Sequence, residues 1–144
     1  MTIRPSGDGE LELELGNRAA LDLWRDITDR AIKSEGPDLT ARQTALLLTI
    51  HLDEEVYTVR SLAKRLGLGK PAIVRALDTL QALGFVRRVR DEKDRRNIFI
   101  EPTEAGAHRL SDIALLIAQG ISSIQTRPII DNADIPNRNS FAAE

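Results

Sequence analysis

The segment from Thr58 to Gly84 constrains the fold of this chain more than any other part of its sequence. Residues 59–66 place apolar side chains on one helical face, and Gly67 follows where a helix end needs a left-handed residue. A second amphipathic segment then opens at Gly69, with Pro71 in its first turn, where proline costs no hydrogen bond. Two short helices joined by a glycine turn predict a helix-turn-helix.

The next residues predict a β-hairpin, which makes the motif a winged helix-turn-helix. Residues 85–90 have the character of a strand, Asp91 to Asp94 form a turn, and residues 97–100 return as a second strand. Six of the ten residues from Arg87 to Arg96 are basic, and such cations repel one another unless an anion is near. A solvated hairpin is the plain alternative, but the density of arginine favours contact with DNA.

Charge is distributed unevenly along the sequence. The whole chain of 144 residues has a formal net charge of −2. Between Tyr57 and Ile100, however, eleven basic residues stand against four acidic ones, which gives this stretch +7 and the remainder −9. A basic centre with acidic ends is the electrostatic pattern that a phosphate backbone attracts.

The flanking segments predict helical arms around this centre. Thr40 and Gln43 have the spacing of a capping box and begin an apolar helix that we expect to be central. Residues 10–15 alternate Glu and Leu, the period of a strand, although a mobile lead-in fits equally well. The predicted organisation is a flexible arm at 1–16, a dimerisation helix at 17–35, a DNA-binding domain at 39–102, a dimerisation helix at 103–126 and a loop-like tail at 127–144.

The last predicted helix carries an aliphatic stripe typical of helix pairing. Its members are Leu110, Ile113, Ile117, Ile121 and Ile124, separated by steps of three or four residues. Gly120 weakens it as an isolated helix. The stripe fits a seam between two subunits better than packing on its own domain, because a single winged helix leaves little surface for it. The expected fold class is therefore mainly α with a small β-hairpin: a winged helix-turn-helix flanked by N- and C-terminal dimerisation helices.

Several runs resemble the multiple-antibiotic-resistance regulator (MarR) family. They are Leu39-Thr40-Ala41-Arg42-Gln43, the apolar positions of the two short helices, Gly84-Phe85-Val86-Arg87-Arg88, Asp94-Arg95-Arg96 and Pro102-Thr103-Glu104-Ala105-Gly106. The resemblance covers about residues 39–106. It implies a homodimer, a repressor of transcription that binds a pseudo-palindromic operator in double-stranded DNA, and often a small aromatic or acidic ligand that releases it. The absence of an export signal separately predicts a cytoplasmic location.

The resemblance also implies where DNA would be contacted. The second short helix would enter the major groove, with Arg75 as the main base or phosphate contact, and Arg95 and Arg96 would enter the minor groove. Asp94 would orient an arginine of the wing, because a carboxylate beside phosphate is repelled. The full set of expected DNA-binding residues is Thr58, Arg60, Ser61, Lys70, Pro71, Val74, Arg75, Arg88, Arg90, Lys93, Arg95 and Arg96.

One departure from the family bears on sequence readout. Pro71 and Ala72 stand where many members carry Ser and Thr. Two hydroxyl donors are thereby missing from the base-facing turn, which shifts the expected readout toward thymine methyl groups and DNA shape.

Other classes of protein are disfavoured. The chain has no cysteine and only two histidines, His51 and His108, with no P-loop, dinucleotide fingerprint or zinc-protease motif around them. We therefore expect no enzyme activity, no catalytic residue, no cofactor and no metal, and without an apolar run or export signal we expect neither membrane insertion nor secretion. The remaining alternative is a winged-helix module that binds protein instead of DNA.

A ligand pocket is the weakest of the site hypotheses. Trp24 on the first helix and His51 on the second are its candidate lining residues. The simpler interpretation makes Trp24 a core residue and His51 a core histidine with satisfied hydrogen bonds.

Overall fold

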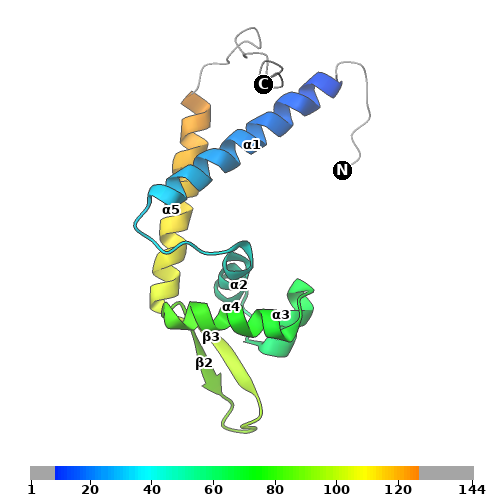
Figure 1. Cartoon of the computed structure of the whole chain (residues 1–144), viewed down its shortest axis with the longest axis vertical. Helices are drawn as coiled ribbons and strands as arrows, with labels where there is room; N and C mark the ends of the chain where they lie inside the picture. Colours follow the sequence, from blue (N-terminus) through cyan, green and yellow to red (C-terminus); the bar gives the residue numbers. More distant parts are fainter. Residues whose placement is uncertain (1–8, 127–144) are drawn as a thin grey trace, which may run out of the picture.

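The computed structural model describes residues 9–126, which form five helices and a three-stranded antiparallel sheet. In chain order the elements are α1 (Gly9–Lys33), α2 (Ala41–Leu52), β1 (Tyr57–Thr58), α3 (Val59–Leu66), α4 (Lys70–Ala82), β2 (Val86–Arg90), β3 (Ile98–Pro102) and α5 (Glu104–Thr126). The long rod of α5 leaves the winged helix at one end of the molecule and is crossed by α1 toward the other (Figure 1). The predicted fold class, mainly α with a winged helix-turn-helix between flanking helices, is confirmed.

A small aliphatic core holds the winged helix together. It joins α2, α3, α4 and the sheet, and its fully buried members are Leu46, Leu47, Leu62, Ile73, Leu77, Leu80, Val86 and Ile100. Each such side chain contributes about 1.5–3 kcal/mol by leaving water. The helix α2 is central, as its apolar sequence predicted, and the predicted capping box is present, with Gln43 N donating to Thr40 Oγ1 at 3.2 Å.

The turn between α3 and α4 has the geometry that the sequence indicated. Gly67 ends α3 with φ of 63°, in the left-handed region that a side chain disfavours. Leu68 N donates to Ala63 O at 3.0 Å, so the chain reverses within one helix end. Gly69 then precedes α4, and Pro71 lies in its first turn.

The sheet has one strand more than the sequence predicted. Its order is β1-β3-β2, with Tyr57 opposite Ile100 in the first pair and Val89 opposite Phe99 in the second. The strand β1 is only two residues long, too short to show a period of two, and its pairing to β3 ties the start of α3 to the base of the wing.

At the N-terminal end, the strand suggested by the alternation of residues 10–15 is wrong. These residues belong to α1, which begins at Gly9 and not near residue 17. Glu and Leu are both good helix formers, so their intrinsic preference agrees with the helix that follows and prevails over the alternation. Of the predicted arm, residues 1–8 lie outside the described residues, as does the predicted tail at 127–144.

Helices α1 and α5 pack closely against each other where Gly120 lies. A β-carbon added at Gly120 would lie 2.9 Å from Ile27 Cγ1 and 3.4 Å from Leu23 Cδ1. The helix α5 is continuous through Gly120. The small size of this glycine allows α1 to approach α5 closely, and the glycine does not interrupt the helix. Between Gly9 and Thr126, no helix combines the length and apolar character that a membrane crossing requires.

The connection between α1 and α2 rests on a buried arginine of α5. Arg109 is 9% exposed, and its Nη2 donates to Pro37 O at 3.2 Å. Its guanidinium lies where a β-carbon on Gly36 would be, so a larger residue there would displace the arginine. This contact fixes the connection between α1 and α2 against α5. The pair of helices α1 and α5 is thereby held to the winged helix.

Candidate nucleic-acid interface

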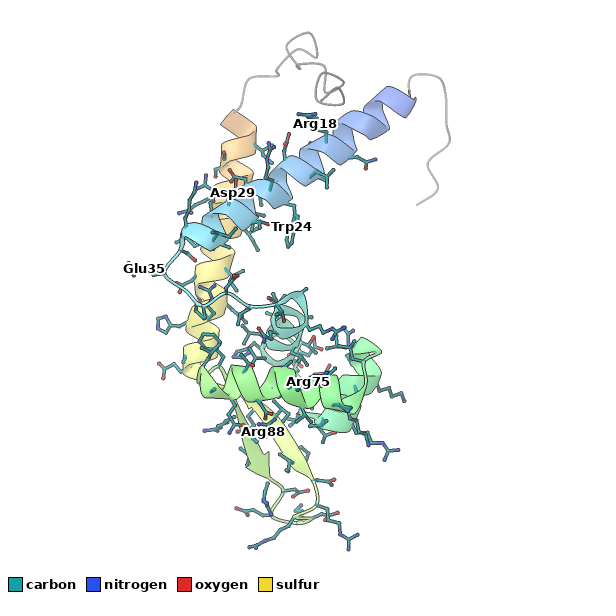
Figure 2. All side chains as sticks on the ribbon, viewed as in Figure 1. Arg18, Trp24, Asp29, Glu35, Arg75 and Arg88 are labelled. Atoms are coloured by element: carbon teal, nitrogen blue, oxygen red, sulfur yellow. The ribbon has the colours of Figure 1, made fainter. Side chains whose placement is uncertain are left out.

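The helix α4 presents a polar and cationic side to solvent. Ile73, Leu77 and Leu80 are buried in the core, whereas the residues predicted to face DNA are exposed: Lys70, Pro71, Val74 and Arg75. Figure 2 shows Arg75 on α4, with the wing extending beyond this helix. A short helix with one buried and one open side is the arrangement that allows entry into a major groove.

The first turn of α3 places two predicted phosphate contacts in a cap. Thr58 Oγ1 accepts from Ser61 N at 3.1 Å, and Ser61 Oγ accepts from Thr58 N at 2.8 Å. Ser61 Oγ also donates to Thr58 O at 3.1 Å. These hydroxyls are engaged in holding the helix end, while Arg60 beside them is exposed and free to reach an anion.

The tip of the wing is built by its acidic residues and covered by its basic ones. Asp91 Oδ1 accepts from Lys93 N at 2.9 Å, and Asp94 Oδ1 accepts from Arg96 N at 3.1 Å. Asp94 therefore positions an arginine through the backbone and not through the guanidinium. Arg90, Lys93, Arg95 and Arg96 are all exposed, and none forms an ion pair within the described part of the chain.

Arg88 occupies a different position from the other predicted DNA contacts. Its guanidinium donates to Asp78 Oδ1 at 2.7 Å and to Gln81 Oε1 at 2.8 Å, both on α4. Figure 2 places Arg88 next to α4 at the root of the wing. Sequence reasoning missed this brace because Asp78 and Arg88 lie ten residues apart, on a helix and a strand whose relative position the sequence does not give.

A second ion pair fixes the wing across its two strands. Arg87 on β2 lies opposite Glu101 on β3, with Nη2 and Oε2 2.7 Å apart. Opposite charges facing each other in an antiparallel ladder stabilise the pairing modestly. Knowledge of the register, which the sequence alone did not supply, would have revealed the pair.

Tyr57 connects the end of α2 to the sheet. Its side chain is 4% exposed, and its hydroxyl donates to Asp53 Oδ2 at 2.5 Å. This hydrogen bond, together with burial and the nearby carboxylates, raises the pKa of Tyr57 above its usual value. The contact holds the turn that delivers Thr58 to the start of α3.

The two candidate pocket residues lie in different settings. His51 is partly buried and faces the start of α5, with Nδ1 3.0 Å from Leu47 O and Nε2 3.4 Å from Thr103 O. Both oxygens are acceptors, so the tautomer decides which of the two ring nitrogens donates. Trp24 is 68% exposed on α1, which makes its interpretation as a core residue wrong for the single chain (Figure 2). The arrangement gives no support to a pocket shared by the two. Among the described residues, no three His, Asp or Glu side chains gather in a way that would suit a metal ion.

Comparison with known proteins agrees with this geometry. Residues 38–97 match the model of the MarR family. Among solved structures, YusO from Bacillus subtilis has a TM-score of 0.66 at 18% identity, covering 83% of each chain. The transcriptional regulator BldR from Sulfolobus solfataricus has a TM-score of 0.55 at 26% identity, covering 90% of each chain. A MarR mutant from E. coli, in complex with operator DNA, has a TM-score of 0.55 at 24% identity, covering 81% of this chain and 78% of that one.

The fold defines a winged helix-turn-helix protein with helical arms. The resemblance to the MarR family of transcriptional regulators, indicated by the sequence, is confirmed.

Proposed function

We propose that this protein is a sequence-specific regulator of transcription that binds double-stranded DNA as a homodimer and acts as a repressor. The observation that carries the proposal is the set of exposed cations on α3, α4 and the wing. Within the described residues, none of these forms an ion pair: Arg60, Lys64, Arg65, Lys70, Arg75, Arg90, Lys93, Arg95 and Arg96. Three acids of the same region accept hydrogen bonds from the protein itself: Asp78, Asp91 and Asp94.

The contacts we propose follow from this surface. With α4 in a major groove, Arg75 and Lys70 reach base edges or phosphates, and Pro71 and Val74 face thymine methyl groups. Arg95 and Arg96 at the wing tip enter the neighbouring minor groove. Arg60 binds the backbone, and Thr58 and Ser61 support it by holding the end of α3. The E. coli MarR mutant crystallised with operator DNA has the same fold, which supports this mode of binding.

The homodimer is supported by apolar side chains left open on the helical arms. Leu21, Trp24 and Ile32 on α1 are 68–70% exposed, and Leu115 and Ile121 on α5 are exposed as well. Apolar surface of this kind marks an interface, and a two-fold axis would bury the same patch on both subunits. Such a dimer presents two α4 helices, which must lie about 34 Å apart to enter successive major grooves.

Release by a small aromatic or acidic ligand is part of the proposal and rests on the family resemblance. A ligand shifts the protein away from DNA only when it binds better to a dimer with another spacing. Trp24, the only tryptophan of the chain, reports on such binding through its fluorescence. A titration with aromatic acids that changes neither the fluorescence nor DNA binding would remove this part of the proposal.

The experiment that tests the main proposal is DNA binding as a function of salt. Genomic fragments are selected by the full-length protein, and the affinity for the selected duplex is then measured between low and high salt. Each neutralised phosphate contributes a slope of about −0.9 in log affinity against log salt. We expect a steep slope and a preference for the selected sequence over random duplex. The absence of binding at low salt would overturn the proposal and favour a protein-binding winged helix.

A further inference from the structure

A surface groove lies between the first turn of α2 and the side of α4. Two helices that are separated by about thirty residues in sequence form its walls. Its lining residues are Thr40, Ala41, Arg42, Gln43, Ala72, Arg75, Ala76 and Thr79. None of the eight is acidic, and two of them, Arg42 and Arg75, are arginines.

The two arginines of the groove differ from those at the root of the wing. Arg42 on α2 and Arg75 on α4 are exposed, and neither forms an ion pair between residues 17 and 124. Arg87 and Arg88, by contrast, are each paired with a carboxylate. Asp78, the acid nearest to Arg75 along α4, is held by Arg88 and so leaves the charge of Arg75 uncompensated.

The end of α2 adds to the positive potential of this groove. The first turn of α2 contains no acidic residue. Thr40 and Gln43 close the end by a reciprocal cap, with Thr40 N donating to Gln43 Oε1 at 2.9 Å. A capped first turn that contains no carboxylate and carries Arg42 favours an anion in front of it.

We propose that Arg42, together with Arg75, binds a phosphate of the DNA backbone at the edge of the major groove that α4 enters. This inference rests on the proposed function and adds a contact from α2, outside the helix-turn-helix. The groove is continuous with the exposed side of α4, so a duplex seated on that helix brings one of its strands past Arg42. Because a phosphate is the same at every step of the duplex, the contact positions the protein and carries no sequence information.

The test is the salt dependence of DNA binding by Arg42→Ala in the full-length protein. We expect a slope shallower than that of the wild type by about 0.9, and an affinity about eight-fold weaker at 0.1 M salt if it is unchanged at 1 M. The loss should be equal on selected and random duplex. Arg42→Lys keeps the charge and should keep the slope, and Lys33→Ala removes the same charge from α1 and should have no effect.

The outcomes separate this inference from the function on which it rests. A wild type with a steep slope and an Arg42→Ala protein with the same slope would overturn the phosphate contact alone. A loss confined to the selected duplex would also overturn it, because Arg42 would then read bases. A wild type that does not bind DNA would overturn the proposed function and this contact together. Circular dichroism of each variant checks that α2 is retained.

Discussion

The arginines of the winged helix divide into two groups according to whether a carboxylate lies within reach. Arg87 pairs with Glu101 and links the two strands of the wing, and Arg88 pairs with Asp78 and links the wing to α4. Arg90, near the end of the same strand β2, is exposed and has no carboxylate partner in the described part of the chain. Within the four positions from Arg87 to Arg90, two arginines therefore stabilise the fold and a third is left without an ion-pair partner.

This division predicts opposite effects for two matched substitutions. Arg88→Ala should lower the free energy of unfolding by up to about 1 kcal/mol, the usual range for an ion pair near the surface, and should leave the salt slope of DNA binding nearly unchanged. Arg90→Ala should leave stability unchanged and make the slope shallower by about 0.9. Chemical denaturation and salt-dependent binding measure the two quantities. Equal changes in slope for both variants would contradict the assignment of Arg88 as a brace.

The tyrosine that joins α2 to the sheet predicts a dependence on pH. The pKa of Tyr57 is raised in the folded state, first by its hydrogen bond to Asp53, so folding favours the protonated phenol. The resulting stability is complete below the ordinary tyrosine pKa and is lost as pH rises through the higher folded value. Tyr57 is the only tyrosine, so phenolate absorbance titrates it alone. We expect a midpoint above the ordinary value that falls in Asp53→Asn; a midpoint unchanged by that substitution would contradict the role of the carboxylate.

At the scale of elements, the junction of α5 with the winged helix depends on a glycine. A β-carbon on Gly106 would collide with Phe85 O and with the imidazole of His51. Phe85 O belongs to the backbone and cannot rotate away, so either α5 or the root of β2 must move. At the same junction Thr103 caps the start of α5, with Gly106 N donating to Thr103 Oγ1 at 3.1 Å.

Gly106→Ala should therefore destabilise the protein, even though alanine is the better helix former. Overpacking of this kind costs about 1–3 kcal/mol, against a gain of up to about 1 kcal/mol from helix propensity. Thermal and urea unfolding measure the net effect. Ala107→Ser, at the exposed neighbouring position, should stay within about 0.5 kcal/mol. A Gly106→Ala protein as stable as the wild type would show that the junction relaxes without cost.

At the scale of the whole molecule, the winged helix and the helical arms carry different surfaces. The winged helix is built around its own core and carries the unpaired cations on its surface, whereas α1 and α5 leave Leu21, Trp24, Ile32, Leu115 and Ile121 exposed. This division agrees with the proposal that the winged helix binds DNA and that α1 and α5, at the other end of the molecule, bind a second copy of the chain (Figure 1).

The proposed dimer predicts the effect of one charge on α1. Trp24→Glu should shift the protein to a monomer at concentrations where the wild type is dimeric, because a carboxylate would be buried in an apolar interface. Sedimentation equilibrium measures the change. Arg60→Glu, on α3, is the matched control and should remain dimeric. A dimeric Trp24→Glu protein would show that this part of α1 lies outside the interface.

Local sequence determined the winged helix because its signals lie close together along the chain. Gly67 and Gly84 mark helix ends, and Pro71 marks the first turn of α4. Thr40 and Thr58 cap α2 and α3, and the basic run from Arg87 to Arg96 indicates the wing. Each of these effects acts within a few residues and needs no partner from elsewhere in the fold. The same locality explains why residues 10–15 misled: their alternation matched a strand, but the preference of Glu and Leu for a helix prevailed.

Only the tertiary structure decided which side chains are free to act. The pairing of Arg88 with Asp78, the burial of Arg109 under the linker and the exposure of Trp24 depend on how distant elements pack. The groove that joins Arg42 to Arg75 depends on the same packing. An ion pair or a groove needs two elements at a fixed separation, which burial of the shared core sets. The sequence by itself determined that this chain has a basic winged helix, and the packing of that core decided which of its arginines face outward.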